Sequence, residues 1–371
     1  MNKNKKKKTI VITGGGTLGH VLPILPVVYS IYKDYNLYFI GTNKGVEKKY
    51  FYDNNINLYF KKIYYLDMIG IDRKNIFKNI ITVCKYFKTK KEIKKIFSEI
   101  KPNLIIGMGG YISGVVVNEG IKKKIKTIIY EQNSVLGLSN KLLYKKVNKL
   151  LLSVDINNIK CKNKVIVGNP RLNYVRSNYK TSDNNYILIF GGSLGSEYIN
   201  NLILDNINYF NINNYNIKII VGKKYYKNNI DKINSINNKN ILIYDFLDNI
   251  LDEMSNASLI ISRSGSSTIS EILGLRKPSI LIPSPNVTGN HQYLNAYNLY
   301  NNGCCEMIEE KELTKENLNN LINKLLTNYN IRNKIINNIN NIYRNNCLLD
   351  FINEIGNILW LIILVLSIKI N

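Results

Sequence analysis

Short apolar runs alternate with longer amphipathic or polar stretches along most of the chain. The runs are rich in Ile, Leu and Val, as in Thr9–Thr13, Leu104–Met108 and Leu259–Ile261. Continuous runs of this kind are typical of strands buried on both faces of a parallel sheet, and the intervening stretches have helical length. The pattern predicts an α/β protein. Further strands are expected at Leu37–Gly41, Tyr59–Ile63, Thr127–Tyr130, Leu150–Val154, Val165–Val167, Tyr186–Phe190, Ile217–Val221, Ile241–Tyr244, Ser279–Ile282 and Glu306–Ile308, and helices at Val21–Tyr32 and Glu312–Asn346.

Each half of the chain begins with a strand and a glycine-rich turn. The turns are GGGTLGH at Gly14–His20 and GGSLG at Gly191–Gly195, and a further one, GMGGYISG, lies at Gly107–Gly114. A glycine turn between a strand and a helix lets backbone approach a phosphate or a sugar closely, although a plain tight turn has the same residues. The repeated design predicts two doubly wound domains with a cleft between them.

The expected boundaries follow from this repetition. We expect a first domain at 1–168, a second at 169–349 and a helical or apolar tail at 350–371. The turn Gly168–Arg171 and the polar segment Arg176–Asn185 are typical of an interdomain linker.

Polar side chains of the second half gather in Ser262–Asn295. The strand ending at Ile261 runs through small residues into a helix that contains Glu271 about one turn inside. Free N–H groups at such a helix start attract anions, and the carboxylate is placed to bind a vicinal diol such as a ribose. The next strand ends in a loop with His291 and Gln292. A ligand crevice at two strand ends is predicted, while an ordinary capped helix explains the start equally well.

In the first half, the strand at Thr127–Tyr130 runs into Glu131, Gln132 and Asn133. Polar groups at a strand end are costly to bury unpaired. They are therefore expected to meet a polyhydroxylated ligand or one another.

The charge balance favours an anionic partner. Lys and Arg number 51 against 26 Asp and Glu, a net charge of +25. Nucleic acid, anionic lipid and phosphorylated substrates all fit such a balance, and part of it reflects a composition heavy in Asn, Lys, Ile and Tyr. The five cysteines show no metal-ligand spacing and indicate reduced thiols in the cytosol. The early glycines interrupt any signal-peptide core, so no export is expected.

Two segments are candidates for membrane contact. In Asp67–Lys95, apolar residues alternate with lysines, which suits an anionic membrane surface but also a core helix with a solvated face. The apolar run Ile358–Ile368 spans about 17 Å as a helix against roughly 30 Å of bilayer core, too short to cross. It is expected to be a buried terminal helix or, failing that, a surface anchor.

Seven motifs in this order resemble the MurG family, bacterial enzymes that add N-acetylglucosamine to the lipid-linked peptidoglycan precursor. The motifs are GGGTLGH, GMGGYISG, YEQNSVLGLSNK, GNPR, GGSLGS, FLD and SRSGSSTISE through NHQYLNA, and the resemblance covers Thr9 to about Asp350. It implies a GT-B fold, with lipid I bound by the N-terminal domain, UDP-N-acetylglucosamine by the C-terminal domain, and lipid II as the product. It also implies a peripheral enzyme at the cytoplasmic face of the cell membrane and no cofactor.

The resemblance assigns roles to individual positions. Glu271 matches the ribose-binding glutamate, Asn133 the asparagine at the sugar hydroxyls, and Gln292 a glutamine near the sugar. Arg171 and Ser193 match residues at the diphosphate, and the Leu247 backbone matches the uracil contact. His20 and Glu131 match the positions proposed for catalysis, and Gly16 and Tyr111 those for the acceptor. The remaining donor contacts match Thr17, Leu18, Gly19, Ser266, Ser267, Thr268, Ile269 and Ser270.

The chain departs from the family pattern at several points. Tyr130 stands where some members have histidine, and His291 where many have glutamine. GNPR replaces a longer GNPxR, which leaves the reach of Arg171 open. The segment Trp360–Asn371 has no counterpart in the family pattern.

An inverting displacement needs a base for the acceptor hydroxyl and positive groups for the departing UDP. The sequence has no DxD triplet, which argues against a metal at the diphosphate. His20 is the first candidate for the base and Glu131 its competitor. A different nucleotide-sugar GT-B enzyme, for example a glycolipid transferase or a UDP-N-acetylglucosamine epimerase, shares the second half but has no use for the acceptor motifs. A nucleic-acid binder requires lysines clustered with aromatics in one groove, whereas here they are dispersed.

Overall fold

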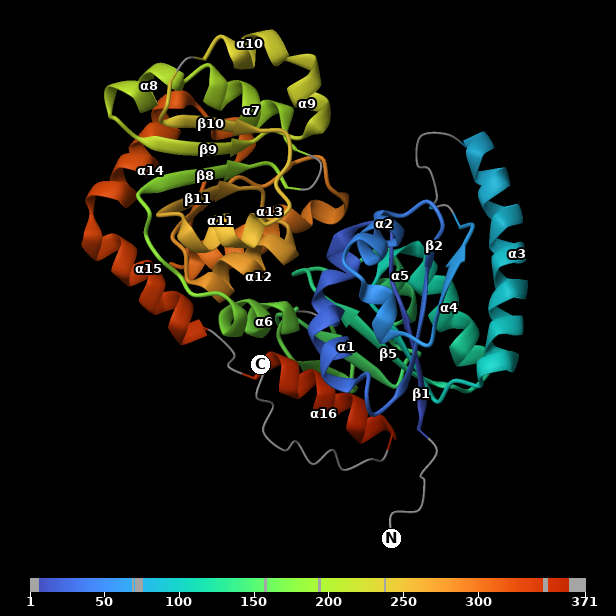
Figure 1. Cartoon of the computed structure of the whole chain (residues 1–371). Helices are drawn as coiled ribbons and strands as arrows, with labels where there is room; N and C mark the ends of the chain where they lie inside the picture. Colours follow the sequence, from blue (N-terminus) through green and yellow to red (C-terminus); the bar gives the residue numbers. More distant parts are fainter. Residues whose placement is uncertain are drawn as a thin grey trace. The chain divides into compact units, whose positions relative to one another are not determined.

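The computed structural model describes residues 7–68, 70, 76–156, 159–192, 195–236, 238–342 and 346–359. The chain forms two compact units (Figure 1). The first unit is Met1–Arg171 together with Asn346–Asn371, and the second is Leu172–Asn345. The chain thus returns to the first unit at its end.

The first unit contains a sheet of seven parallel strands in the order β3-β2-β1-β4-β5-β6-β7. The strands are β1 (Thr9–Thr13), β2 (Asn36–Thr42), β3 (Lys62–Leu66), β4 (Leu104–Gly107), β5 (Lys126–Glu131), β6 (Lys149–Leu152) and β7 (Lys164–Ile166). The predicted third strand at Tyr59–Ile63 was wrong by three residues, because Ile56–Tyr59 is a 3-10 helix, η3. β3 lies at the sheet edge, where only Leu66 of its residues is buried, so an apolar run does not mark its bounds.

Helices cover both faces of this sheet. They are α1 (Leu25–Ile31), α2 (Val46–Asp53), α3 (Ile76–Ile100), α4 (Gly110–Lys122), α5 (Leu138–Leu143) and α16 (Cys347–Leu359), with 3-10 turns η1 (Leu18–His20) and η2 (Leu22–Ile24). The helix predicted from Val21 is α-helical only from Leu25. Pro23 and Pro26 lack the N–H that an earlier α-helical turn needs, so the chain enters the helix through η1 and η2.

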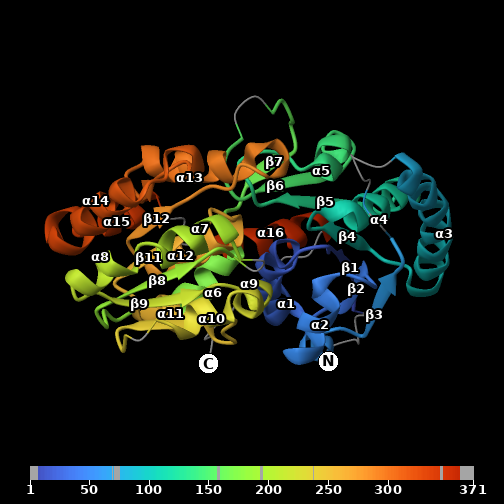
Figure 2. The ribbon, with the colours of Figure 1, turned by 90° about the horizontal axis from the view of Figure 1, so that it is seen from above.

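Alternation along each strand divides the core of this unit into two layers. Ile10 and Ile12 of β1 pack with α1 and α16, whereas Val11 packs on the opposite face with α3 and α4. In Figure 2, α3 and α4 lie next to each other on one side of the first unit's sheet. The result is a three-layer α/β unit of the kind that the apolar runs predicted.

The C-terminal helix α16 is part of the first unit's core. Its Phe351 is fully buried, with its ring 5.5 Å from that of Tyr130. Glu354 forms an ion pair with Lys149 of β6 at 3.1 Å. Of the run 358–368, predicted as a buried terminal helix, only Ile358 and Leu359 are described, and both are buried at the end of α16. The rest of the run lies outside the described residues. No helix among those described is long and apolar enough to cross a bilayer.

The second unit contains six parallel strands in the order β10-β9-β8-β11-β12-β13. They are β8 (Tyr186–Phe190), β9 (Asn216–Ile220), β10 (Ile241–Tyr244), β11 (Leu259–Ser262), β12 (Ser279–Leu281) and β13 (Glu306–Met307). The helices are α6 (Pro170–Asn178), which belongs to this unit from Leu172 onward, α7 (Glu197–Leu204), α8 (Ile207–Ile212), α9 (Lys223–Asn228), α10 (Ile230–Asn234), α11 (Ile250–Asn256), α12 (Ser266–Leu275), α13 (His291–Asn301), α14 (Lys315–Thr327) and α15 (Tyr329–Ile342), with 3-10 turns η4 (Thr288–Asn290) and η5 (Glu310–Glu312).

The segment predicted as a linker is partly helical. Pro170 begins α6, and the helix continues to Asn178, so the segment Arg176–Asn185, predicted as part of a linker, is helical at its start. Proline is favoured in the first turn of a helix because the N–H that it lacks has no partner there. A GNPR turn is therefore also a helix start.

Both sheets reverse their strand order next to their first strand. In the first unit β1 lies between β2 and β4, and in the second β8 lies between β9 and β11. Chain segments leaving the carboxyl ends of such a strand pair diverge to opposite faces and open a crevice. The loops after β1 and β4, and after β8 and β11, are therefore where each unit can bind a ligand.

Candidate functional site

The loops after β1 and β4 touch at the crevice of the first unit. The Met108 N–H donates to the Thr13 carbonyl at 2.8 Å. A Cβ atom at Gly110 would lie 2.5 Å from the Gly15 carbonyl oxygen, and one at Gly109 would lie 2.6 Å from Nδ1 of His20. Glycine is needed at both positions, because the backbone φ angles are 82° and 104° as well.

This contact places His20 at the strand-order reversal. His20 ends η1, and its N–H donates to the Thr17 carbonyl at 3.2 Å. Its imidazole lies against the Gly109 backbone. Thr17 is exposed and Leu18 and Gly19 half-buried in the same turn, so this loop presents both backbone and the imidazole at the carboxyl end of β1.

Tyr111 comes to the same place from the first turn of α4. A Cβ atom at Gly16 would lie 3.5 Å from Cε1 of the Tyr111 ring. Burial raises the pKa of the Tyr111 hydroxyl, an effect that the hydroxyl of Thr42 opposes and the charge of Glu47 reinforces. The hydroxyl is therefore protonated at neutral pH and can donate a hydrogen bond.

Glu131 organises the loop that follows β5. Its Oε1 accepts from the N–H and from Nδ2 of Asn133, both at 3.1 Å. Its Oε2 accepts from the Gly137 N–H at 2.8 Å and from Nδ2 of Asn140 at 2.9 Å. These polar groups were predicted to meet a ligand or one another, and in the structure they bind one another. A carboxylate has about four acceptor positions, so four donors occupy its capacity.

The glycine turn after β8 is tightly packed in the second unit. The Gly195 N–H donates to the Gly192 carbonyl at 3.0 Å, and a Cβ atom at Gly195 would lie 2.7 Å from the Val221 carbonyl oxygen. Ser196 then caps α7 by accepting from the Ile199 N–H. Ser193, the residue predicted at the diphosphate, lies outside the described residues.

The start of α12 has the features that the sequence predicted. Gly265 precedes the helix, and Ser270 Oγ donates to the Ser266 carbonyl at 2.8 Å. Ser267 Oγ is buried and makes no hydrogen bond within the described part of the chain. A ligand oxygen at this helix start would satisfy that hydroxyl and the leading N–H groups. Glu271 is buried one turn further on.

The loops after β11 and β12 are joined through α13. Gln292 Oε1 accepts from the Ser284 N–H at 2.9 Å, and its carbonyl accepts from Ser264 Oγ at 2.8 Å. Asn295 Nδ2 donates to the Ser264 carbonyl at 3.4 Å. The two strand ends therefore meet, as predicted, although the Gln292 side chain is held by backbone.

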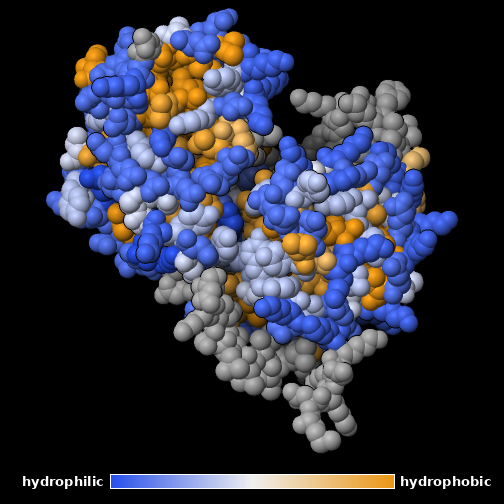
Figure 3. Space-filling view, in the orientation of Figure 1, coloured by the Kyte–Doolittle hydropathy of each residue, from blue (hydrophilic) through white to orange (hydrophobic). Residues whose placement is uncertain are grey.

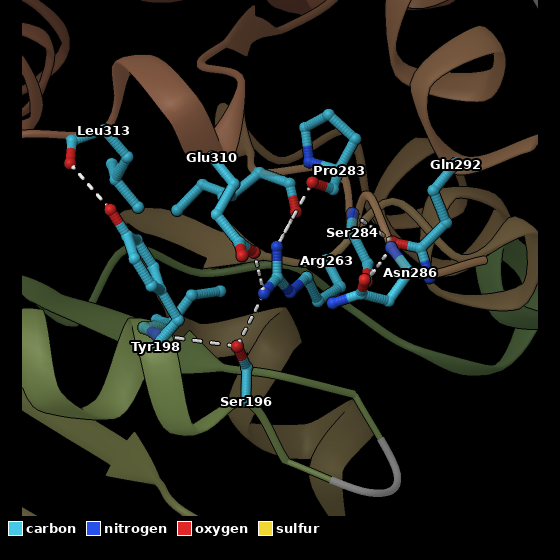
Figure 4. A network of polar contacts seen from close by, with 11 residues as sticks. Ser196, Tyr198, Arg263, Pro283, Ser284, Asn286, Gln292, Glu310 and Leu313 are labelled. Carbon is cyan, nitrogen blue, oxygen red and sulfur yellow. Dashed lines mark hydrogen bonds and ion pairs between the residues drawn. The ribbon is translucent and has the colours of Figure 1, made fainter. Parts of the chain in front are cut away.

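Arg263 connects four segments around this crevice (Figure 4). Its Nη1 donates to the Ile282 and Pro283 carbonyls, both at 3.2 Å, and its Nη2 donates to Ser196 Oγ at 2.7 Å. It also forms an ion pair with Glu310. Sequence reasoning assigned it no role. The available signal was an arginine directly after a buried strand, where an unpaired charge is not tolerated.

The other predicted residues are divided between the units. Asn133 and Arg171 lie in the first unit, where Arg171 is buried and its N–H donates to Asn169 Oδ1 at 3.0 Å. Leu247 and Ile269 lie in the second unit, and their side chains pack against its core, so their backbone is what remains for a ligand. Thr268 is half-buried in the first turn of α12. Within the described residues, no cluster of three or more His, Cys, Asp or Glu is placed to hold a metal ion.

Family models match most of both units. The glycosyltransferase family 28 N-terminal domain matches residues 10–152, and the glycosyltransferase family 28 C-terminal domain matches residues 186–343.

Relatives named UDP-N-acetylglucosamine–N-acetylmuramyl-(pentapeptide) pyrophosphoryl-undecaprenol N-acetylglucosamine transferase align over nearly their full length. The protein of Leuconostoc mesenteroides is 36% identical over 337 residues, which cover 86% of this chain and 90% of the relative. That of Bacillus subtilis is 34% identical over 335 residues, covering 86% and 91%.

Solved structures show the same fold. MurG of Acinetobacter baumannii superposes with a TM-score of 0.72 at 23% identity, covering 94% of this chain and 99% of that one. UDP-N-acetylglucosamine 2-epimerase of Neisseria meningitidis has a TM-score of 0.64 at 12% identity, covering 94% and 100%. At these identities the likeness concerns the fold, and it is the sequence relatives and the two family models that separate the transferases from the epimerases. The chain belongs to the MurG family of GT-B glycosyltransferases.

Proposed function

We propose that this protein transfers N-acetylglucosamine from UDP-N-acetylglucosamine to the muramyl C4 hydroxyl of lipid I and so forms lipid II for peptidoglycan synthesis. The observation that carries the proposal is the identity above 30% with transferases of this name over more than four-fifths of the chain. The two crevices, each built from glycine-rich loops at a strand-order reversal, supply a place for each substrate.

Most of the residues assigned to the donor lie in the second unit. The start of α12 offers N–H groups and Ser266, Ser267 and Ser270 to its polar groups, and Glu271 accepts hydrogen bonds from the ribose hydroxyls. The Leu247 backbone contacts the uracil, and Gln292 and Asn133 contact the sugar. Ser193 and Arg171 serve the diphosphate, with the remaining donor contacts from Thr17, Leu18, Gly19, Thr268 and Ile269.

The loops of the first unit serve the acceptor and the base. Gly16 and Tyr111, which lie against each other, contact lipid I. His20 accepts the proton of the attacking hydroxyl, a task for which imidazole is suited near neutral pH. Glu131 keeps the loop with Asn133 in place, since its oxygens already accept four hydrogen bonds.

No divalent cation is required in this proposal. Charge on the departing UDP is compensated by the N–H groups at the helix start and by Arg171. Turnover that persists in excess EDTA supports this, and loss of turnover that Mg²⁺ restores contradicts it.

The protein acts as a peripheral enzyme at the anionic cytoplasmic face of the membrane. Support comes from α3, whose exposed Val83 and Phe87 lie next to lysines at 85, 88 and 91. An apolar strip flanked by lysines binds anionic bilayers at the headgroup level. Figure 3 shows hydrophobic patches among hydrophilic residues on the visible face of both units.

A transfer assay with radiolabelled UDP-N-acetylglucosamine and a lipid I analogue tests the reaction. The expected product is labelled lipid II analogue. Conversion of the donor to its 2-epimer without acceptor would instead indicate an epimerase.

Glu271→Gln tests the donor site. Because a hydrogen bond to a charged group contributes about 1.5–3 kcal/mol, the variant is expected to raise the KM for the donor roughly tenfold or more. It should also no longer distinguish the donor from its 2′-deoxyuridine analogue. Glu316→Gln, an exposed glutamate in the first turn of α14, is the matched control and should leave both values unchanged. Unchanged discrimination by Glu271→Gln would remove this residue from the ribose site.

A further inference from the structure

Glu47 is a fully buried carboxylate beneath the first glycine turn. It is the second residue of α2 and has no solvent exposure. Among the described residues it forms no ion pair within 4 Å with Lys, Arg or His. A buried charge without a counter-ion costs several kcal/mol unless hydrogen bonds compensate it. Packing alone therefore does not explain why a carboxylate is buried at this position.

The carboxylate connects the end of β2 to the glycine turn. Oε1 accepts from the N–H of Thr42 at 2.7 Å and from its hydroxyl at 2.6 Å. Oε2 accepts from the N–H of Gly16 at 3.2 Å. Gly16 has a φ of 87°, a conformation that needs support from its surroundings. Glu47 therefore fixes the direction in which this peptide group points.

Glycines make room for this arrangement. A Cβ atom at Gly15 would lie 2.3 Å from Oε1, and one at Gly45 would lie 2.0 Å from Oε2. A Cβ atom at Gly41 would lie 3.3 Å from Oε1. Two of the glycine positions that surround the carboxylate lie outside the Gly14–His20 motif, so the space for Glu47 is built from three separate segments.

The same contacts reach Tyr111. Its hydroxyl is close enough to Thr42 and Glu47 for both to affect its pKa, and Thr42 is the residue that donates twice to Glu47. Its ring lies against Gly16, whose N–H Glu47 holds. One carboxylate thus supports both residues proposed to contact the acceptor, Gly16 directly and Tyr111 through the contact of its ring with Gly16.

We propose that Glu47 is a positioning residue for the acceptor site, holding the Gly14–Gly16 turn and Tyr111 in the arrangement that receives lipid I. This inference rests on the proposed transfer reaction and deepens it. Glu47 itself touches neither substrate, because its side chain lies fully buried below the turn.

Glu47→Gln separates this role from packing. The amide has the shape of the carboxylate but one acceptor oxygen in place of two. Two donors of Thr42 hold that oxygen at the Oε1 position, so the NH2 group faces the Gly16 N–H. Two opposed donors push the turn out of place. We expect kcat/KM for the lipid I analogue to fall at least tenfold. The KM for UDP-N-acetylglucosamine should change less, through Thr17 to Gly19 of the same turn, and the Kd for UDP should stay within twofold.

Glu119→Gln is the matched control. Glu119 is also a buried glutamate of the first unit, but it pairs with Lys122 and Lys90 and lies nine residues after the start of α4, about 13 Å along the helix. It should leave the acceptor and donor constants unchanged even if the melting temperature falls.

If Glu47→Gln does not fold, Thr42→Val takes its place. Valine keeps the β-branched shape and removes the hydroxyl that donates to Glu47, and it should lower acceptor kcat/KM in the same direction. Acceptor constants within twofold of the wild-type value for the folded variant, or equal losses for donor and acceptor, would overturn the inference. A wild-type protein that makes no lipid II would instead refute the proposed function.

Discussion

Buried polar side chains at the strand ends of this protein act mainly on backbone. Glu131 holds the loop after β5, Glu47 holds the first glycine turn, and Arg263 holds the ends of β12 and the start of α7. Each is compensated by several hydrogen bonds, which offset the cost of burying a charge. These three charged residues therefore determine where the turns at the strand ends lie.

Arg263→Lys is predicted to weaken donor binding. Lysine has no planar group that reaches two carbonyls, a serine and a carboxylate at once, so the loops after β8, β11 and β12 lose their common connection. We expect the Kd for UDP, measured by calorimetry, to rise about tenfold, the equivalent of about 1.4 kcal/mol. Lys311→Arg, an exposed change in η5, serves as the control. An unaltered Kd in the Arg263 variant would show that the network does not support the donor site.

The cysteines are predicted to differ in reactivity. Burial raises the pKa of the Cys304 thiol to about 11, and burial raises that of Cys305 further. At pH 8 both therefore remain protonated, and only the thiolate attacks an alkylating reagent. Mass spectrometry after iodoacetamide treatment at pH 8 should find Cys84, which is exposed, labelled first and Cys304 and Cys305 unlabelled until the protein unfolds. Early labelling of Cys305 would contradict the packing around β13.

The hydrophobic pattern predicted some helices and strands, whereas others depend on tertiary packing. The buried strands β1, β8 and β11 coincide with apolar runs, because a parallel strand covered on both faces needs apolar residues throughout. β3 at the sheet edge was misplaced and the helix that begins at Pro170 was not predicted, because neither has such a run. Nothing in the sequence indicated that α16 packs with α1, since the two are far apart along the chain.

Phe351→Ala is predicted to destabilise the first unit. Its ring is fully buried between α16 and the sheet, and removing a buried phenylalanine side chain costs about 3–5 kcal/mol. Urea unfolding followed by circular dichroism should show the loss. Phe87→Ala, at a residue 61% exposed on α3, is the matched control and should change the unfolding free energy by less than about 0.5 kcal/mol. Equal effects of the two would mean that α16 adds little to the fold.

Over the whole molecule, net charge and fold address different questions. The charge of +25 favours anionic partners of any kind, whereas two parallel sheets with the same order of strands indicate ligand crevices without identifying the ligands. The family relationship identifies the reaction class. The positive charge would favour the proposed contact with an anionic membrane.

Flotation with phosphatidylglycerol vesicles tests that contact. Wild-type protein should float with the vesicles at low salt and dissociate as salt is raised, because screening weakens the attraction between lysines and lipid headgroups. Phe87→Glu should reduce flotation, whereas Ile212→Glu, an equally charged change at an exposed residue of α8, should not. Equal flotation of all three proteins would exclude α3 as the membrane-facing element.

The sequence by itself determined the alternation of strands and helices, the two glycine-opened halves and the motifs that resemble the family, because these depend on residue type and local spacing. Only the tertiary structure decided that α16 completes the first unit, that Glu131 is occupied by its own loop, and that Glu47 and Arg263 hold the turns proposed to face the ligands. These facts depend on which distant segments a buried charge contacts, and a hydrogen bond between segments far apart along the chain leaves no local pattern in the sequence.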